Sequence, residues 1–410
     1  MRPGATFANV AWLAVSLPEY LRFRHAAMRT AVAQRHLLQR YVRKNADTAF
    51  GRTHDFAGIH SYEDWAAAVP VRTYDDYADW IDAIANGEQR VLTAQPVRLF
   101  EPSSGSSGAE KWIPYTAALQ AEFRRAVATW ICDLFLANPA LIGGRAYWSL
   151  TPPAAPRERA PSAVPVGFDE DSAYLGGIAQ RLVRLTLATP ADLALITDAE
   201  EFWRVTADTL SACHDLRLIS AWHPSFVLLL REKVLEHVGA DANPWPNLGL
   251  VSCWGDAQAA TLLPDLRAAF PGVTIQPKGL LATEGVVTLP IGDRFPLALR
   301  SHFFEFESDD GTIRPAWNLD DGAHYQVILT TGGGLYRYAL RDRVRVNGYL
   351  GDTPCLRFVG RADTVSDLCG EKLSEDFVAS CLATVFDDCN ARPRFALIAP
   401  DEDASRYCLF

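Results

Sequence analysis

The stretch that decides the fold is VRLFEPSSGSSGAEK, from Val97 to Lys111. Its first four residues predict a strand, Ser103–Gly108 predicts a loop, and the apolar spacing of Thr116–Leu136 predicts a long helix, which together make a strand–loop–helix unit. Glycines let backbone N–H groups turn toward one point, hydroxyls add donors, and Lys111 adds a positive charge. Such a loop favours a phosphate group. The alternative is an ordinary flexible loop, because the P-loop pattern does not fit.

Short apolar strands alternate with helices in the middle of the chain. Strands are expected at Arg145–Leu150, Leu216–Ala221 and Leu248–Cys253. Helices are expected at Ser225–His237 and Gln258–Phe270. This alternation is typical of βα units on a mostly parallel sheet.

The flanking parts have different textures. The first hundred residues predict helices, including an N-terminal helix over Phe7–Leu17. A second helix, Ser61–Ala67, opens with an acidic capping box formed by Ser61 and Asp64. From residue 273 onward strands and turns dominate, and helix returns only at Ser374–Phe386.

Composition and charge exclude several classes of protein. The 410 residues are 49% hydrophobic and carry 39 Lys and Arg against 49 Asp and Glu, which gives a net charge of −10. Such a chain can bury a core and offers little attraction to a nucleic-acid backbone. No run reaches the roughly 20 apolar residues of a membrane span. The 8 cysteines form no CxxC pair, so we expect reduced thiols in a cytoplasmic protein.

Three later segments carry polar residues that suit nucleotide chemistry. Glu284 follows Thr283 between two apolar runs, where a buried carboxylate needs a cation such as magnesium; the alternative is a solvent-exposed turn. Asp342 ends the run TTGGGLYRYALRD and suits both ribose hydroxyls, unless it forms a salt bridge with a neighbouring arginine. The polar segment Gly360–Lys372 is a hinge or a charged connector.

The order and type of these motifs resemble those of the Gretchen Hagen family. This family comprises the plant auxin- and jasmonate-conjugating acyl-acid amido synthetases, whose genes are auxin-responsive, and their bacterial relatives. The motifs are, in order, SSGSSGAEK, ATEG, LYRYALRD and GRADTVSDLCGEKL. The likeness extends to Asn45–Arg52 (NADTAFGR) and Val69–Tyr77 (VPVRTYDDY), so it covers essentially the whole chain.

The resemblance also implies a fold, because the family belongs to the adenylate-forming superfamily of acyl-CoA synthetases and luciferases. The expected class is α/β, mixed α+β. A large N-terminal domain with helix-flanked β-sheets and a β-barrel-like part is followed by a small α+β C-terminal domain.

The resemblance further implies a site for ATP and magnesium. It assigns the ATP phosphates to six loop residues, namely Ser103, Ser104, Gly105, Ser106, Ser107 and Gly108. Thr283 and Glu284 resemble the pair that meets the α-phosphate and magnesium. Glu284 is therefore the expected metal ligand and, with Lys111, the expected catalytic residue. Asp342 matches the ribose-binding Asp.

Two positions depart from the family's pattern. The plant enzymes usually carry an aromatic residue four positions before the Glu, where adenine stacks, and this chain has Leu280. The residue before the ribose Asp is usually Gly, and here it is Arg341. A separate candidate for the acyl pocket is Trp222–Ser225, which is more simply the start of a helix with Pro224 in its first turn.

The implied reaction has two steps. A carboxylate attacks the α-phosphorus of ATP and expels pyrophosphate, and an amine then attacks the acyl-adenylate to give an amide. The substrates would be a small carboxylic acid and an amino acid or other amine, with no nucleic-acid or membrane partner. Two rivals stay open: transfer of the acyl group to coenzyme A or a carrier thiol, and a degenerate nucleotide-binding protein without catalysis.

The chain is predicted to divide at residue 360. Residues 1–360 would form the large domain that binds ATP and the acid, and residues 361–410 the hinge and an incomplete start of the C-terminal domain. Arg361, also assigned to the ATP site, and Asp363 match the family's hinge. Phe395–Ile398 and Tyr407–Phe410 predict a hairpin without a polar exit, so we expect a piece of a longer product that binds ATP but exchanges pyrophosphate weakly.

Overall fold

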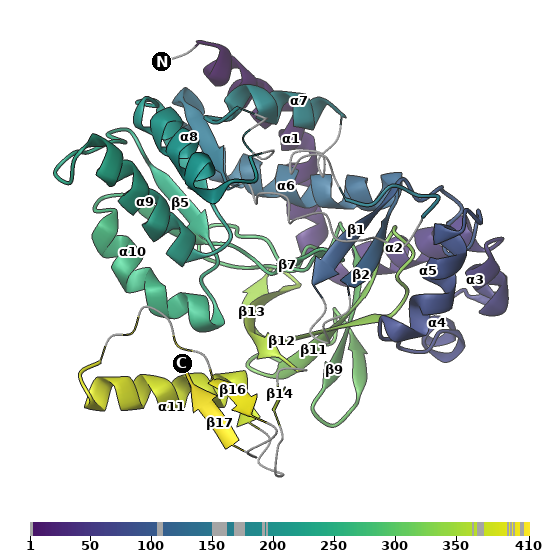
Figure 1. Ribbon diagram of the computed structural model, residues 1–410. Helices are drawn as coiled ribbons and strands as arrows, with labels where there is room; N and C mark the ends of the chain where they lie inside the picture. Colours follow the sequence, from purple (N-terminus) through teal and green to yellow (C-terminus); the bar gives the residue numbers. More distant parts are fainter. Residues whose placement is uncertain are drawn as a thin grey trace.

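The computed structural model describes residues 3–104, 110–149, 162–167, 177–190, 193, 196–362, 365–366, 373–391, 393, 396, 398–401 and 406–410. These residues form a parallel sheet, an antiparallel sheet and a smaller C-terminal part, as Figure 1 shows. The α-helices are α1 (Pro3–Ala27), α2 (Thr30–Asn45), α3 (Ala49–Thr53), α4 (Tyr62–Ala68), α5 (Ala78–Ala85), α6 (Ala117–Ala137), α7 (Gly177–Thr186), α8 (Ala199–Ser211), α9 (Pro224–Val238), α10 (Leu263–Ala269) and α11 (Glu375–Asp388).

The parallel sheet confirms the predicted βα alternation. Its strands β3 (Arg145–Trp148), β4 (Leu216–Ser220), β5 (Leu250–Cys253) and β6 (Thr274–Pro277) lie in sequence order. Because side chains alternate along a strand, Leu218 packs toward α1, α6 and α7, whereas Ile219 packs toward α8, α9 and α10. Figure 1 shows the two groups of helices on opposite sides of this sheet. The carboxyl ends of the strands are therefore left for a ligand.

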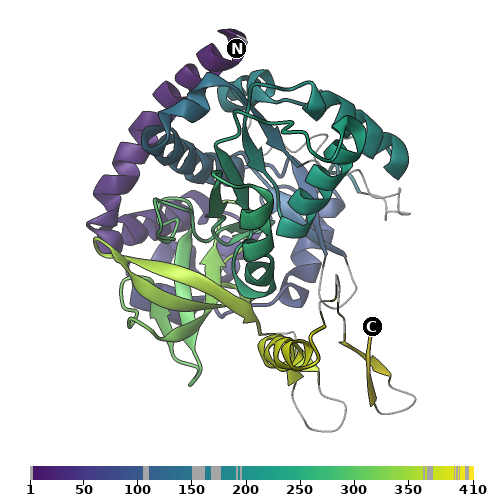
Figure 2. The ribbon, with the colours of Figure 1, turned by 90° about the vertical axis from the view of Figure 1, so that its left-hand side faces the viewer.

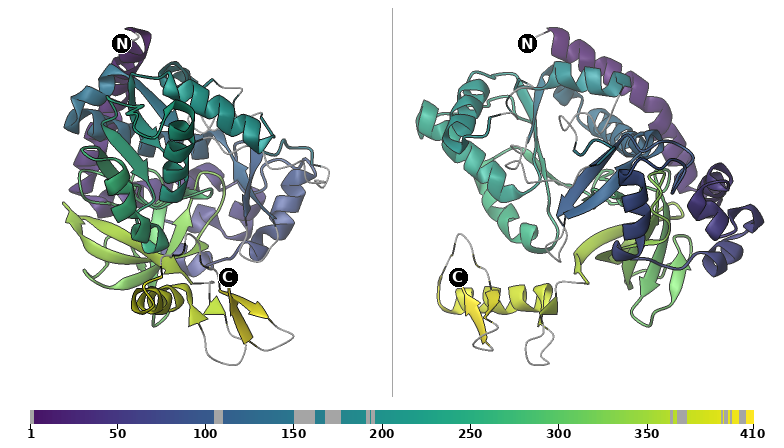
Figure 3. Two further views of the ribbon diagram at one scale, coloured as in Figure 1. Left: turned by 60° about the vertical axis from the view of Figure 1, so that its left-hand side comes forward. Right: turned by 45° about the vertical axis from the view of Figure 1, so that its right-hand side comes forward.

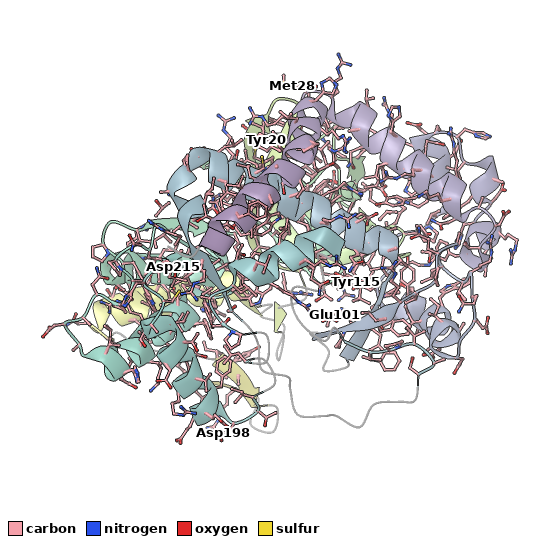
Figure 4. The ribbon with its side chains drawn as sticks, turned by 90° about the horizontal axis from the view of Figure 1, so that it is seen from above. Tyr20, Met28, Glu101, Tyr115, Asp198 and Asp215 are labelled. Atoms are coloured by element: carbon pink, nitrogen blue, oxygen red, sulfur yellow. The ribbon has the colours of Figure 1, made fainter. Side chains whose placement is uncertain are left out.

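Helix α1 runs along the edge of the molecule and confirms the predicted N-terminal helix (Figure 2). The Tyr20 hydroxyl donates a hydrogen bond to Asp133 Oδ1 of α6 over 3.1 Å, and Figure 4 shows from above Tyr20 on this helix and Met28 just beyond its end. Asn9 Nδ2 donates to the carbonyl of Gly144, which precedes β3. None of the described helices is long and apolar enough to cross a membrane. The seven cysteines in the described residues are free thiols.

The antiparallel sheet occupies the part predicted to be β-barrel-like. Its strands, in spatial order, are β10 (Ile313–Pro315), β9 (Phe303–Ser308), β11 (His324–Thr330), β12 (Tyr338–Leu350) and β13 (Thr353–Arg361). Helices α2 to α5 cover it through a core that is rich in aromatic rings. For example, Phe50 stacks on Tyr336 with 4.9 Å between ring centroids. The capping box of Ser61 and Asp64 at the start of α4 is confirmed.

Residues 97–136 do not form the predicted strand–loop–helix unit. Strand β1 (Leu99–Ser104) pairs antiparallel with β2 (Glu110–Tyr115), and α6 begins only after β2, where the Thr116 side chain caps it. The predicted helix over Thr116–Leu136 is thus confirmed, but the Ser/Gly loop connects two strands and does not lead into the helix. Pro114, which would disfavour the interior of a larger sheet, lies on β2, whose ladder partner among the described residues is β1.

The C-terminal elements are α11, the short strands β14 (Val365–Ser366) and β15 (Leu373–Ser374), and the strands β16 (Ile398–Asp401) and β17 (Arg406–Leu409). Strands β16 and β17 pair antiparallel, which confirms the hairpin, although Phe395 lies outside the described residues. Figures 2 and 3 show this part beyond the end of β13, away from the N-terminus. The mixed α/β class with helix-flanked sheets is confirmed.

Candidate functional site

Glu284 lies in the turn between β7 (Leu281–Ala282) and β8 (Gly285–Val286). Its side chain is buried, and the Tyr338 hydroxyl donates a hydrogen bond to Glu284 Oε1 over 3.3 Å. Burial raises the pKa of Glu284, and the charges of Lys111 and Arg361 partly oppose this rise. The alternative of a solvent-exposed turn is therefore wrong. A buried carboxylate that is influenced by two cations interacts strongly with any further charge, because little water is present to screen it.

Strand β12 carries two site residues on one face. Tyr338, Leu340 and Asp342 alternate with exposed or half-buried neighbours, as the two-residue period of a strand requires. Asp342 lies opposite Arg361 of β13, with 3.7 Å between Arg361 Nη1 and Asp342 Oδ1. The neighbouring Arg343 pairs with Asp309 instead, at 2.7 Å. Tyr338 thus contacts Glu284 directly, and Arg361, the partner of Asp342, acts on the charge of Glu284.

Lys111 enters the site from strand β2. It pairs in register with Ser103 of β1. The hairpin therefore places Ser103 beside Lys111, and Ser103 is the one residue of the Ser/Gly loop whose side chain is described. Lys111 Nζ lies 5.9 Å from the centre of the Tyr74 ring, whose hydroxyl accepts a hydrogen bond from the Trp112 backbone N–H. Five other predicted positions lie outside the described residues or side chains, namely Ser104, Gly105, Ser106, Ser107 and Gly108. Asp363 of the hinge also lies outside them.

The two departures from the family pattern have different structural settings. Arg341 has φ +64°, the left-handed region in which a glycine is unstrained and a side chain costs about 1 to 2 kcal/mol. Its carbonyl accepts a hydrogen bond from Ala362 N, just beyond β13. Leu280 packs, half-buried, on the core beneath the antiparallel sheet, and its N–H donates to Thr288 Oγ1. Leu280 therefore offers an apolar surface and no stacking ring.

A buried network behind Glu284 was not predicted from the sequence. The Val286 N–H donates to His302 Nε2, so the ring proton is on Nδ1 and donates to Glu122 Oε2 over 3.0 Å. The same carboxylate accepts hydrogen bonds from the Tyr41 hydroxyl and from the Gly332 N–H. Glu122 on α6 thus connects the turn of Glu284 with the Gly-rich turn before β12.

The sequence pattern could have indicated Tyr338 as a site residue, but it could not have indicated Glu122. Tyr338 stands four residues before Asp342, so the alternation of a strand would have placed both on one face. Glu122 is 180 positions from His302, and nothing local indicates that contact. A Cβ on Gly285 would come within 2.8 Å of His302 Nε2, which explains why glycine follows Glu284.

The segment Trp222–Ser225 is the start of a helix, as the simpler interpretation holds. His223 is the N-cap of α9, and its ring accepts a hydrogen bond from the Ser225 N–H. Pro224 occupies the first turn. Burial lowers the pKa of His223, so the neutral ring that this cap needs is favoured. The Trp222 ring, just before this cap, is 40% exposed.

The fold defines the class of protein. The structure is similar to the solved 2-hydroxyisobutyryl-CoA ligase in complex with 2-HIB-AMP and CoA, with a TM-score of 0.55 and 14% identity over 94% of this chain and 78% of that one. It is more similar to a solved GH3.15 acyl acid amido synthetase, with a TM-score of 0.79 and 18% identity over 94% of this chain and 78% of that one. The chain therefore has the fold of the adenylate-forming enzymes.

The family follows from sequence. The GH3 family N-terminal domain matches residues 20–240 and the GH3 family central domain matches residues 295–361, so the chain belongs to the GH3 family, the Gretchen Hagen family of the sequence analysis. Two similar relatives are plant proteins. The probable indole-3-acetic acid-amido synthetase GH3.12 of Oryza sativa subsp. japonica is 24% identical, over 86% of this chain and 72% of the relative. The probable indole-3-acetic acid-amido synthetase GH3.1 of Arabidopsis thaliana is also 24% identical, over 91% and 74%.

Proposed function

We propose that this protein is an ATP-dependent ligase that adenylates a small carboxylic acid and transfers the acyl group to an amino acid or other amine. The observation that carries the proposal is the buried Glu284, held by Tyr338 and influenced by Lys111 and Arg361, in a chain of the GH3 family. The solved and curated relatives with amido synthetase names support the amine as acceptor. The fold shared with a CoA ligase keeps a thiol acceptor as the second candidate.

ATP would contact the β1–β2 loop, Lys111 on β2 and Asp342 on β12. The loop between β1 and β2 would surround the phosphates, Lys111 would meet the phosphate charge, and Asp342 would accept hydrogen bonds from the ribose hydroxyls. Arg361 would stay paired with Asp342 at the end of β13. The division of the chain at residue 360 and the hinge function of Arg361 remain predictions.

Magnesium fits the donor set. Among the described residues no group of three or more His, Cys, Asp or Glu side chains is arranged to hold a metal on its own. Magnesium needs no such group, because it is usually held by one or two carboxylates together with substrate phosphates. Glu284 would supply the one carboxylate beside Thr283. When bound, the ion would add positive charge at the phosphates, where negative charge accumulates.

The residues of the chain would lower the barrier by electrostatics and positioning. The first step brings an anionic carboxylate to an anionic phosphate, so it needs fixed positive groups, and Lys111 supplies one from a rigid strand. The carboxylate oxygen would form the new bond to the α-phosphorus while pyrophosphate leaves. A neutral amine would then attack the acyl carbon and release AMP. No side-chain nucleophile is needed at either step.

Pyrophosphate release, measured across carboxylic acids crossed with amino acids and with coenzyme A, tests the reaction. We expect release that requires both ATP and an acid, and product analysis should show an amide with an amino acid. A thioester with coenzyme A as the sole product would replace the proposal with the second candidate. The absence of acid-dependent release with every pair would refute both and leave a nucleotide-binding protein.

ATP affinity tests the site assignment separately from the reaction. Glu284→Ala and Asp342→Ala should each weaken ATP binding at least tenfold, because each removes a group that the ligand would contact. The exposed Asp265→Ala on α10 is the matched control and should bind like the wild type. Unchanged affinity in both site variants would remove the assignment. A cytoplasmic location is likewise proposed, and cell fractionation would test it.

A further inference from the structure

Lys278 stands at the carboxyl end of the parallel sheet, outside the group around Glu284. It directly follows β6, its N–H donates to the Cys253 carbonyl at the end of β5, and its Nζ donates to Ser220 Oγ at the end of β4 over 2.7 Å. Ligands of open α/β sheets bind in the crevice beyond these strand ends. Lys278 therefore occupies the position at which a substrate would meet the sheet.

Aromatic rings surround the ammonium group of Lys278. Its Nζ lies 5.1 Å from the centre of the Trp130 ring and 6.0 Å from that of Trp222. Trp222 in turn contacts Trp254, with 5.9 Å between ring centroids, and these two rings are 40% and 41% exposed. Rings of this size are seldom left open to water on two adjacent loops. They form an apolar wall beside a cation.

The charge of Lys278 has no carboxylate partner among the described residues. The one titratable group that acts on it is the Cys253 thiol, and burial raises the pKa of that thiol to about 11, so it is neutral near pH 7. Burial lowers the pKa of Lys278 to about 8, so the ammonium is still mostly charged at pH 7. An ammonium has three donors, and within the described residues Ser220 accepts from one. The side chain as a whole is half-buried and lies beside the exposed rings of Trp222 and Trp254.

The site of Lys278 is separate from that of the phosphates but close enough to serve the same substrate. Lys111 and Arg361 are the cations that act on Glu284, whereas the Cys253 thiol acts on Lys278. Lys278 precedes Glu284 by six positions, which limits the separation of their Cα atoms to about 20 Å. A small acid can lie between them.

We propose that Lys278 binds a carboxylate of the acid substrate, whose flat apolar body lies against Trp222 and Trp254. This inference rests on the proposed function and names the specificity residue of its acyl site. The carboxylate is either the reacting one or a second one on the same acid. In both cases a carboxylate would bind the Lys278 ammonium group beside an indole ring. The assay below distinguishes the reacting carboxylate from a second one.

The test compares Lys278→Met with the wild type in acid-dependent pyrophosphate release, with benzoate and with terephthalate as probes. Met keeps the length of the stem and removes a charge that burial disfavours, so the variant should fold. Lys233→Met, on the exposed surface of α9, is the matched control. We expect the Lys278 variant to raise the KM for the acid roughly ten- to a hundredfold while the KM for ATP stays unchanged.

The two acids identify the carboxylate. If the KM rises for both acids, Lys278 binds the reacting carboxylate, and if it rises for terephthalate alone, Lys278 binds the second one. An unchanged KM for both acids would overturn the proposal. In the wild type the affinity for the acid should fall as the pH rises through about 8, and Lys278→Met should lose this dependence.

A binding measurement keeps this test independent of catalysis. Quenching of tryptophan fluorescence by the same acids should appear in the wild type, shrink in Trp222→Phe and weaken in Lys278→Met. If the wild type binds the acids through Lys278 but releases no pyrophosphate, the proposed function fails and this inference stands. If the wild type releases pyrophosphate and Lys278→Met binds every active acid equally well, the inference fails and the proposed function stands.

Discussion

Replacing Glu122 tests the buried network that supports the turn of Glu284. The Glu122 carboxylate accepts hydrogen bonds from the Gly332 N–H over 2.9 Å, from His302 Nδ1 over 3.0 Å and from the Tyr41 hydroxyl over 2.7 Å. Glu122→Ala removes all three acceptors. Glu122→Gln keeps one oxygen, which can take the place of Oε2, and its NH2 group then faces Tyr41.

The hydrogen bonds of Glu122 determine how much stability each of the two variants should lose. Tyr41 also donates to the Ser301 carbonyl, so Glu122→Ala leaves two buried donors without an acceptor, those of Gly332 and His302. His302 cannot change tautomer to escape, because its Nε2 must accept from Val286. Each orphaned donor costs about 1 to 3 kcal/mol, so the free energy of unfolding should fall by about 2 to 6 kcal/mol. Glu122→Gln loses the charge assistance and one of the two acceptors of the Tyr41 hydroxyl, which keeps the Ser301 carbonyl, so it should cost less, about 1 to 2 kcal/mol.

The assay is thermal unfolding followed by circular dichroism, with ATP affinity measured on the folded variants. The midpoint should fall in the order wild type, Glu122→Gln, Glu122→Ala, and the exposed Glu236→Ala on α9 should match the wild type within about 0.5 kcal/mol. ATP affinity should weaken with Glu122→Ala, because the Glu284 turn loses its support. Equal midpoints for the Ala and Gln variants would refute the reasoning.

Three further predictions concern single side chains. Arg337→Met should lower the free energy of unfolding by about 3 to 5 kcal/mol in denaturant titrations, because it leaves the buried Glu305, 2.9 Å from the guanidinium, without its charge partner. Arg314→Met breaks a surface pair with Asp320 and should change stability far less, and equal costs for the two variants would contradict the burial argument. Arg341→Gly should stabilise the protein by about 1 kcal/mol and so raise the thermal midpoint, without weakening ATP binding, because φ +64° suits glycine. A lower midpoint would show that the arginine is needed there. Glu284→Gln should raise the thermal midpoint at pH 7 to 8 and match the wild type near pH 4. Burial raises the pKa of Glu284 in the folded state above its ordinary value of 4.5, so the wild type loses stability as the pH rises and this carboxyl group ionises. A lower midpoint for the variant at pH 8 would contradict this reasoning.

The sequence predicts those parts of the fold that depend on local pattern. The apolar runs at β4 and β5 read as strands because both faces of a parallel sheet are buried, and Ser61 with Asp64 marks a helix start because the two side chains cap it mutually. The hairpin of β1 and β2 was not predicted, because it depends on the pairing of Phe100 with Pro114, fourteen positions away, which no local pattern marks.

The candidate site shows the same division. Glu284, Asp342 and Lys111 could be chosen because each stands in a recognisable motif. The contact of Glu122 with His302 and the setting of Lys278 between Trp130 and Trp222 arise only when α6, β9 and the strand ends meet in space. No local spacing encodes such contacts. The positive φ of Arg341 also explains, after the fact, why the family prefers glycine there.

The measurement that tests the central claim most directly is acid-dependent ATP–pyrophosphate exchange by the wild type and by Glu284→Gln. Exchange reports formation of the acyl-adenylate itself and needs no amine. We predict exchange that requires a carboxylic acid in the wild type and falls at least a hundredfold in the folded Glu284→Gln protein, because the carboxylate at the centre of the site is lost. Exchange at the wild-type rate in Glu284→Gln would contradict the account.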